Sequence, residues 1–68
     1  LSDKELQEYI VGSLPGVGGG IAKTLLEKFK TVRKVFTASE ESLQKVDLIG
    51  EKKAKRIREI LDKEYEGD

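Results

Sequence analysis

Apolar residues recur at intervals of three and four along most of this chain, as they do on one face of an α-helix. Alternating apolar and polar residues, the pattern of a half-buried strand, extend over only a few positions at a time. Glycine, proline and hydroxyl-bearing residues separate the helical stretches and mark their ends. The pattern therefore predicts an all-α fold made of five short helices.

The first predicted helix has Asp3 as its N-cap and ends before Gly12 and Pro15, after about ten residues. Its apolar face is expected to consist of Leu6, Tyr9 and Ile10. The second helix is expected to begin at Gly19 or Gly20 and to end at Phe29. Its core-facing residues are expected to be Ile21, Ala22, Leu25, Leu26 and Phe29.

Three more helices are predicted in the second half of the chain. Thr31 opens a short one that contains Val32, Val35 and Phe36. Either Thr37 or Ser39 caps the next, and Thr37 offers a capping box with Glu40 three residues later. The apolar side of that helix is expected to hold Leu43 and Val46. The last helix is expected over about 51–64, with inward-facing residues Ala54, Ile57, Ile60 or Leu61, and Tyr65.

One motif occurs twice in the chain, as LPGVG at 14–18 and as VDLIG at 46–50. Each copy places an apolar residue before a short turn and ends in a glycine, and an alanine follows at the fourth position after that glycine. The last glycine is expected to adopt a turn conformation that a Cβ would oppose, and the alanine allows close helix packing. Two such helix-turn-helix units with a connecting helix predict a pseudo-twofold bundle, with hairpin turns at about 14–20 and 46–52.

The composition narrows the classes of function. Sixty-eight residues with 37% apolar content allow one domain, 1–68, with a single small core and no deep catalytic cleft. The chain has no Cys and no His, so the sequence predicts no disulfide, no cofactor and no metal site, and favours an intracellular location, in a nucleoid or a nucleus. Its apolar runs are shorter than the roughly 18 residues of a membrane span, so no membrane partner is expected. Because the chain begins without Met, we expect it to be part of a larger protein.

Charge is distributed unevenly although the formal net charge is zero. Residues 20–58 hold eleven Lys or Arg against five Asp or Glu, a net charge of +6, whereas residues 1–19 sum to −2 and residues 59–68 to −4. A basic middle segment that includes two glycine turns leading into helix N-termini is suited to bind an anion. Two such turns favour a clamp on a phosphate backbone over a pocket for a small-molecule substrate.

These residues resemble the tandem helix-hairpin-helix family, (HhH)2, over nearly the whole chain. The first copy fits the family pattern apolar-x-Gly-apolar-Gly-x-x-x-Ala, with LPGVG at 14–18 and Ala22. Within the family, the stretches LLEKF, TVRKVFTAS and IGEKKAKRI are most similar to the C-terminal domain of XPF-type structure-specific nucleases, including the archaeal Hef helicase-nucleases. That resemblance implies a non-catalytic module that binds branched or forked DNA, helps a repair endonuclease to dimerise, and pairs with itself or with a paralogue.

The resemblance also implies which residues contact DNA. Backbone N–H groups at the turn glycines would meet phosphate oxygens without reading bases, and lysines in the following helices would add charge. The implied DNA-binding residues are Gly16, Gly18, Gly19, Gly20, Lys23, Gly50, Lys52, Lys53, Lys55 and Arg56. Leu48 stands where the family usually places the first turn glycine of the second hairpin, so we expect two unequal hairpins.

Several readings stay open at the level of sequence. The glycines could serve only to reverse the chain, and Leu48 could be either a core residue or an exposed apolar tip. The basic run, which consists of Lys52, Lys53, Lys55, Arg56 and Arg58, could be a solvated helix face. The domain could therefore act mainly as a dimerisation module with weak or no DNA binding. A lyase that uses a lysine Schiff base is a further alternative, which requires a buried or crowded lysine.

Overall fold

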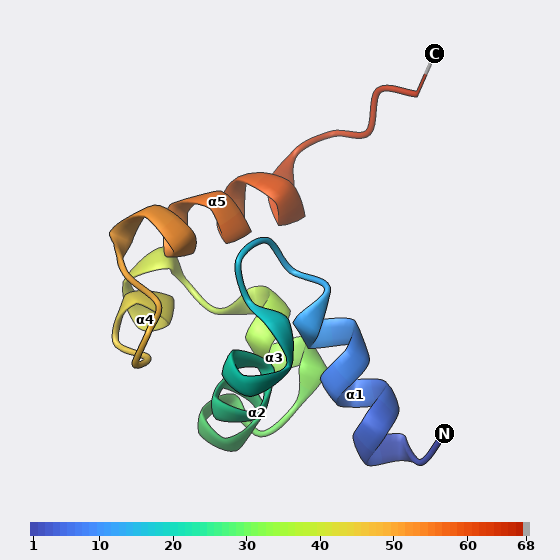
Figure 1. The fold of residues 1–68 in the computed structure, drawn as a ribbon. Coiled ribbons are helices and arrows are strands. Elements are labelled where there is room, and N and C mark those ends of the chain that lie inside the picture. The colour runs from blue at the N-terminus through green and yellow to red at the C-terminus, as the bar shows by residue number, and fades with distance from the viewer. Residues whose placement is uncertain (68) are drawn as a thin grey trace.

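The computed structural model describes residues 1–67, in which all the regular secondary structure is helical (Figure 1). The five helices are α1 (Asp3–Gly12), α2 (Gly18–Phe29), α3 (Val32–Thr37), α4 (Glu40–Gln44) and α5 (Glu51–Asp62). This arrangement confirms the predicted all-α fold of five short helices. No helix within residues 1–67 is long and apolar enough to cross a membrane.

The helices pack as two hairpins joined by α3. Hairpin one consists of α1 and α2 with the turn at 13–17, and hairpin two consists of α4 and α5 with the turn at 45–50. Helix α3 contacts both helices of hairpin one (Figure 1). After α5 the chain leaves the bundle, and Tyr65 is 90% exposed. The prediction that Tyr65 faces inward is therefore wrong, because α5 ends at Asp62 before it reaches that residue.

The core draws equivalent residues from the two halves of the sequence. Ala22 and Ala54 are both fully buried, as are Leu25 and Ile57 one turn further along each helix. The remaining buried apolar residues are Val11, Leu14, Val17, Val35, Ala38, Leu43, Val46 and Ile49. Burial at matched positions of the two copies supports the predicted pseudo-twofold arrangement.

Helix α1 buries a different face from the one predicted. Val11 is fully buried, whereas Tyr9 is 74% exposed and Leu6 and Ile10 are each 41% exposed. The reason is that α1 packs mainly against α2 and α3, and its C-terminal end is covered while most of its length is exposed. Three large apolar side chains of α1 are thereby left at the surface.

Hydroxyl side chains cap the three helices that do not follow a hairpin turn. Ser2 accepts a hydrogen bond from the Glu5 N–H at 3.1 Å, and the Glu5 carboxylate accepts one from the Ser2 N–H at 3.1 Å. Ser2, not Asp3, is thus the N-cap of α1, and these bonds from Ser2 lower the pKa of Glu5. Thr31 caps α3 and Ser39 caps α4.

The choice between Thr37 and Ser39 follows from a competing bond within α3. The Thr37 hydroxyl donates to the Arg33 carbonyl oxygen at 3.0 Å and so completes α3. Ser39 instead accepts from the Ser42 N–H at 3.1 Å and begins α4. The capping box predicted between Thr37 and Glu40 does not form.

Candidate nucleic-acid interface

The two hairpin turns have the same hydrogen-bonded geometry at positions 32 residues apart. The Val17 N–H donates to the Leu14 carbonyl oxygen at 3.1 Å, and the Ile49 N–H donates to the Val46 carbonyl oxygen at 3.0 Å. The third residue of each turn has a left-handed backbone, with φ of 72° at Gly16 in hairpin one. Pro before a residue of positive φ is typical of a type II turn, which suits the Pro15–Gly16 pair.

Leu48 is the counterpart of Gly16, and its φ is also 72°. A leucine in this region is strained because its Cβ crowds the backbone. The side chain is 77% exposed, so the alternative of a core residue is wrong and the exposed apolar tip is confirmed. Hairpin two therefore keeps the backbone path of hairpin one with a residue that is ill suited to it.

The last glycines of the two copies differ in conformation. Gly18 has φ of 67°, as predicted for a position that a Cβ would oppose. Gly50 has φ of −87° and is extended, so the same prediction is wrong for Gly50. Gly50 is the N-cap of α5, whereas Val17 is the N-cap of α2 and Gly18 begins that helix. The two hairpins thus enter their second helices in different ways.

Helices α2 and α5 share one property that sets them apart from the other three. Neither N-cap makes a side-chain hydrogen bond to its helix. The first N–H groups of a helix have no partner within the helix, and its N-terminus carries a partial positive charge. Both helices that follow a hairpin turn can therefore present backbone donors to an anion.

The glycines around these N-termini form a bare surface. A Cβ built on Gly18, Gly19, Gly20 or Gly50 would meet no other atom within 4 Å. Gly19 and Gly20 are exposed and lie in the first turn of α2, where glycine destabilises a helix by about 0.5–1 kcal/mol relative to alanine. Packing within residues 1–67 gives no reason for glycine at these two positions, whereas close approach of a ligand to the backbone would.

Four basic residues in the first half of α5 are exposed, and two of them also contact other groups of the domain. Lys52, Lys53 and Lys55 are exposed, and so is Arg56, which pairs with Glu59 at 3.5 Å. The Lys53 ammonium also donates to the Leu48 carbonyl oxygen at 3.4 Å. The first turn of α5 contains the acidic Glu51 as well, whereas the first turn of α2 has no acidic residue.

Arg58 stabilises the fold through hydrogen bonds within the domain and is not part of the exposed basic surface. Its Nη1 donates to the carbonyl oxygens of Phe36 at 2.6 Å and Ala38 at 3.1 Å, and its Nη2 donates to Asp62 at 2.5 Å. The guanidinium thereby ties α5 to the C-terminal end of α3 and the residue that follows it. Sequence reasoning grouped Arg58 with the basic run, although its spacing of four from the buried Ala54 places it beside the core-facing stripe.

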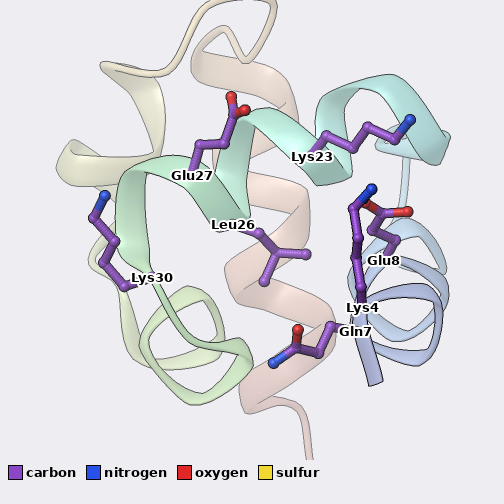
Figure 2. Close-up of a pocket in the computed structure, with 7 residues that line it drawn as sticks. All are labelled: Lys4, Gln7, Glu8, Lys23, Leu26, Glu27 and Lys30. Atoms are coloured by element: carbon purple, nitrogen blue, oxygen red, sulfur yellow. The ribbon is translucent and has the colours of Figure 1, made fainter. Parts of the chain in front are cut away.

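Lys23, the counterpart of Lys55, lies on α2 and lines a groove between α1 and α2 (Figure 2). The groove has a volume of about 310 Å³ and also contains Lys4, whose ammonium is 4.0 Å from the Glu8 carboxylate. Figure 2 shows Lys23 extending toward the end of the groove where Lys4 and Glu8 lie. Lys23 is exposed and can reach a strand that passes hairpin one.

Comparison with known proteins places this geometry in a family. The family model for SAM-like helix-hairpin-helix tandems matches residues 6–63. A protein of Methanocaldococcus jannaschii that carries the name of an ATP-dependent RNA helicase is 58% identical over 67 residues, which are 98% of this chain and 9% of that protein. The 3'-flap repair endonuclease Xpf of Saccharolobus solfataricus is 42% identical over 64 residues, 94% of this chain and 27% of the relative.

Among solved structures, XPF from Aeropyrum pernix in complex with DNA superposes with a TM-score of 0.89 and 42% identity. The match covers 96% of this chain and 32% of the XPF chain. The chain thus spans less than a third of the length of each of these three proteins. These findings confirm the resemblance to XPF-type proteins, and the chain belongs to the tandem helix-hairpin-helix family.

Proposed function

We propose that this chain is a sequence-independent DNA-binding module that grips the phosphate backbone of branched or forked DNA. The difference among the helix N-termini supports the proposal most directly. Hydroxyl groups cap α1, α3 and α4, whereas α2 and α5 have no side-chain cap and leave their first N–H groups to a ligand. Phosphate oxygens are suited to such donors, and contacts of this kind do not read bases.

The relatives support DNA as the anion and a nuclease as the larger protein. The XPF structure that this chain resembles was solved with DNA, and another relative is named a 3'-flap repair endonuclease. The module would hold its parent protein, a structure-specific nuclease or helicase-nuclease of DNA repair, at a junction. The domain would then lie inside the cell, where its DNA is.

The two hairpins would contribute unequally to this grip. Hairpin one offers the more open backbone, because Gly18, Gly19 and Gly20 are bare and its second helix begins without an acidic residue. Hairpin two offers more charge, because Lys52, Lys53 and Lys55 follow its turn. A strand that contacts both would receive backbone donors from one turn and cations from the other.

A non-catalytic role for the domain agrees with the exposure of its lysines. A lysine that forms a Schiff base needs burial or close cations to lower its pKa. Lys52, Lys53 and Lys55 are all exposed, so the burial that would favour such a role is missing at these three positions. Borohydride treatment in the presence of DNA with an abasic site is expected to trap no covalent adduct, and a trapped adduct would contradict the non-catalytic proposal.

Self-association is a second activity that the surface favours. Tyr9 is 74% exposed and Leu48 is 77% exposed, so each offers apolar surface that a second copy of the domain could cover. A stable homodimer, or a pair with a paralogue, would bury more than about 1,000 Å² in total. Sedimentation velocity over a range of concentrations tests self-association, and Leu48→Gly compared with Tyr9→Ser identifies which apolar residue takes part.

The DNA-binding proposal is tested by fluorescence anisotropy of labelled forked DNA. Binding is expected to weaken as salt rises and to be the same for forks of different base sequence, since phosphate contacts dominate. Affinity that depends on base sequence would contradict the proposal. Unchanged affinity at high salt would contradict it as well.

A further inference from the structure

Lys53 contacts the equivalent residue of each hairpin. Its Cδ and Cε carbons lie 3.4 Å, and its Cγ 3.5 Å, from the point where a Cβ on Gly16 would stand. Its ammonium donates to the Leu48 carbonyl oxygen at 3.4 Å. Gly16 and Leu48 are the residues of positive φ in the two turns. One side chain therefore spans from the third residue of one hairpin turn to the third residue of the other.

The position of Lys53 in the chain makes this contact a link between the hairpins. Its backbone belongs to the first turn of α5 and so moves with hairpin two. Its hydrocarbon stem lies against hairpin one, over the backbone of Gly16. A lysine stem of this kind can pack on a neighbouring surface while its charged end stays in water.

We propose that Lys53 is a positioning residue that holds the two hairpin turns at one separation, so that both can contact DNA phosphates together. This inference rests on the proposed DNA-binding function. Two binding elements held in register lose less freedom on binding than two that move independently, so their combined affinity is higher. Lys53 was expected from the resemblance to be a direct phosphate ligand, and the contacts assign it a different role.

The two roles predict different responses to salt. A lysine that neutralises a phosphate releases a counterion, and its loss lowers the slope of log affinity against log salt by about 0.9. A residue that positions the turns leaves the number of phosphate contacts unchanged when it is replaced, so affinity falls while the slope stays the same. Lys52 is the matched control, because it is an exposed neighbour on the same turn of α5.

The experiment compares Lys53→Met, Lys53→Arg and Lys52→Met in the 68-residue chain. Forked-DNA affinity is measured at several salt concentrations, and amide NMR spectra are recorded without DNA. Lys53→Met is expected to weaken binding about three- to tenfold with an unchanged slope, which is comparable to the net contribution of one ordinary hydrogen bond. It should also shift the amide signals of both Gly16 and Leu48. Lys53→Arg, which keeps a stem and a donor, should restore the affinity and both signals.

The control should behave in the opposite way. Lys52→Met is expected to lower the slope of log affinity against log salt and to leave the Gly16 amide NMR signal unshifted. The inference is overturned if Lys53→Met lowers the slope as Lys52→Met does, or if the Gly16 amide does not move. If the unmodified chain does not bind DNA, the proposed function fails by itself. The NMR spectra without DNA then still test whether Lys53 links the two hairpin turns. A shift of both the Gly16 and the Leu48 amide signals in Lys53→Met supports the link, and the absence of that shift overturns it.

Discussion

The stem of Lys53 lies over Gly16, so that a single methyl group added to that glycine would stand 3.4 Å from two of the lysine carbons. Gly16 is therefore constrained twice, by its φ of 72° and by the side chain that covers it. Gly18 is constrained by its φ of 67° but faces open space, and Gly19 and Gly20 face open space without a positive φ. The backbone conformation thus requires glycine at position 16, whereas it does not require glycine at positions 19 and 20.

Gly16→Ala is expected to destabilise the domain. A Cβ at the positive φ of Gly16 costs about 1–2 kcal/mol, wherever the neighbouring lysine stem lies. Urea unfolding followed by circular dichroism measures the change in unfolding free energy. Gly20→Ala is the control, because it lies within α2 in open space and is expected to stabilise the domain by about 0.5–1 kcal/mol. Equal effects of the two variants would contradict the assignment of Gly16.

Gly19→Ala should separate stability from DNA binding. Alanine is the better helix former and meets no atom of the free domain, so the unfolding free energy should rise by about 0.5–1 kcal/mol. If a phosphate approaches the bare backbone here, the added methyl group should weaken binding to forked DNA. A variant that is more stable and binds equally well would remove Gly19 from the proposed interface.

Arg58→Ala is expected to destabilise the domain by about 1.5–3 kcal/mol, because charged hydrogen bonds to two backbone carbonyls are lost. Arg56→Ala removes the same type of side chain from an exposed pair and should cost less than about 1 kcal/mol. The order of the two effects should reverse for DNA affinity. Arg56→Ala is expected to bind forked DNA more weakly than the unmodified chain, whereas folded Arg58→Ala should bind it equally well. Thermal unfolding and anisotropy at one temperature provide both comparisons.

The capping box at the N-terminus of α1 predicts that the stability of the domain depends on pH. Hydrogen bonds from Ser2 hold the pKa of Glu5 below its usual range, so the charged carboxylate stabilises the folded state above the pKa of the unfolded chain. That contribution is lost as pH falls through the lowered pKa of the folded state. Ser2→Ala should raise the pKa of Glu5 in an NMR titration, and its stability deficit should narrow at acidic pH. A Glu5 pKa that is not lowered in the unmodified chain would show that the box does not form in solution.

Much of the fold was predictable because its two halves repeat. The matched apolar residues and the matched alanines identified the core of both hairpins, and Ala22 and Ala54 are fully buried as expected. The face of α1 was mispredicted because periodicity reports which residues are apolar, not how much of a helix its neighbours cover. The cap of α1 was also missed, although Ser2 and Glu5 have the spacing of a capping box.

The candidate interface was less predictable than the core. Sequence alignment of the two copies matched Gly18 with Gly50, but their backbones differ because Gly50 caps α5 while Gly18 lies within α2. The link through Lys53 could not be inferred, since it depends on how close the two hairpins approach. The predicted contacts at Gly16, Gly18, Gly19, Gly20, Gly50, Lys23, Lys52, Lys55 and Arg56 remain predictions for DNA binding.

The most direct test of the central claim is the salt dependence of binding to forked DNA by the 68-residue chain. Fluorescence anisotropy at about 50 and about 200 mM salt should give a dissociation constant of roughly 10⁻⁴ to 10⁻⁶ M at the higher salt and at least about tenfold tighter binding at the lower, as expected if two or more phosphates are contacted. Circular dichroism on the same sample shows whether the chain is folded. Folded protein that does not bind at either salt concentration would contradict the account and leave self-association as the better explanation of this domain.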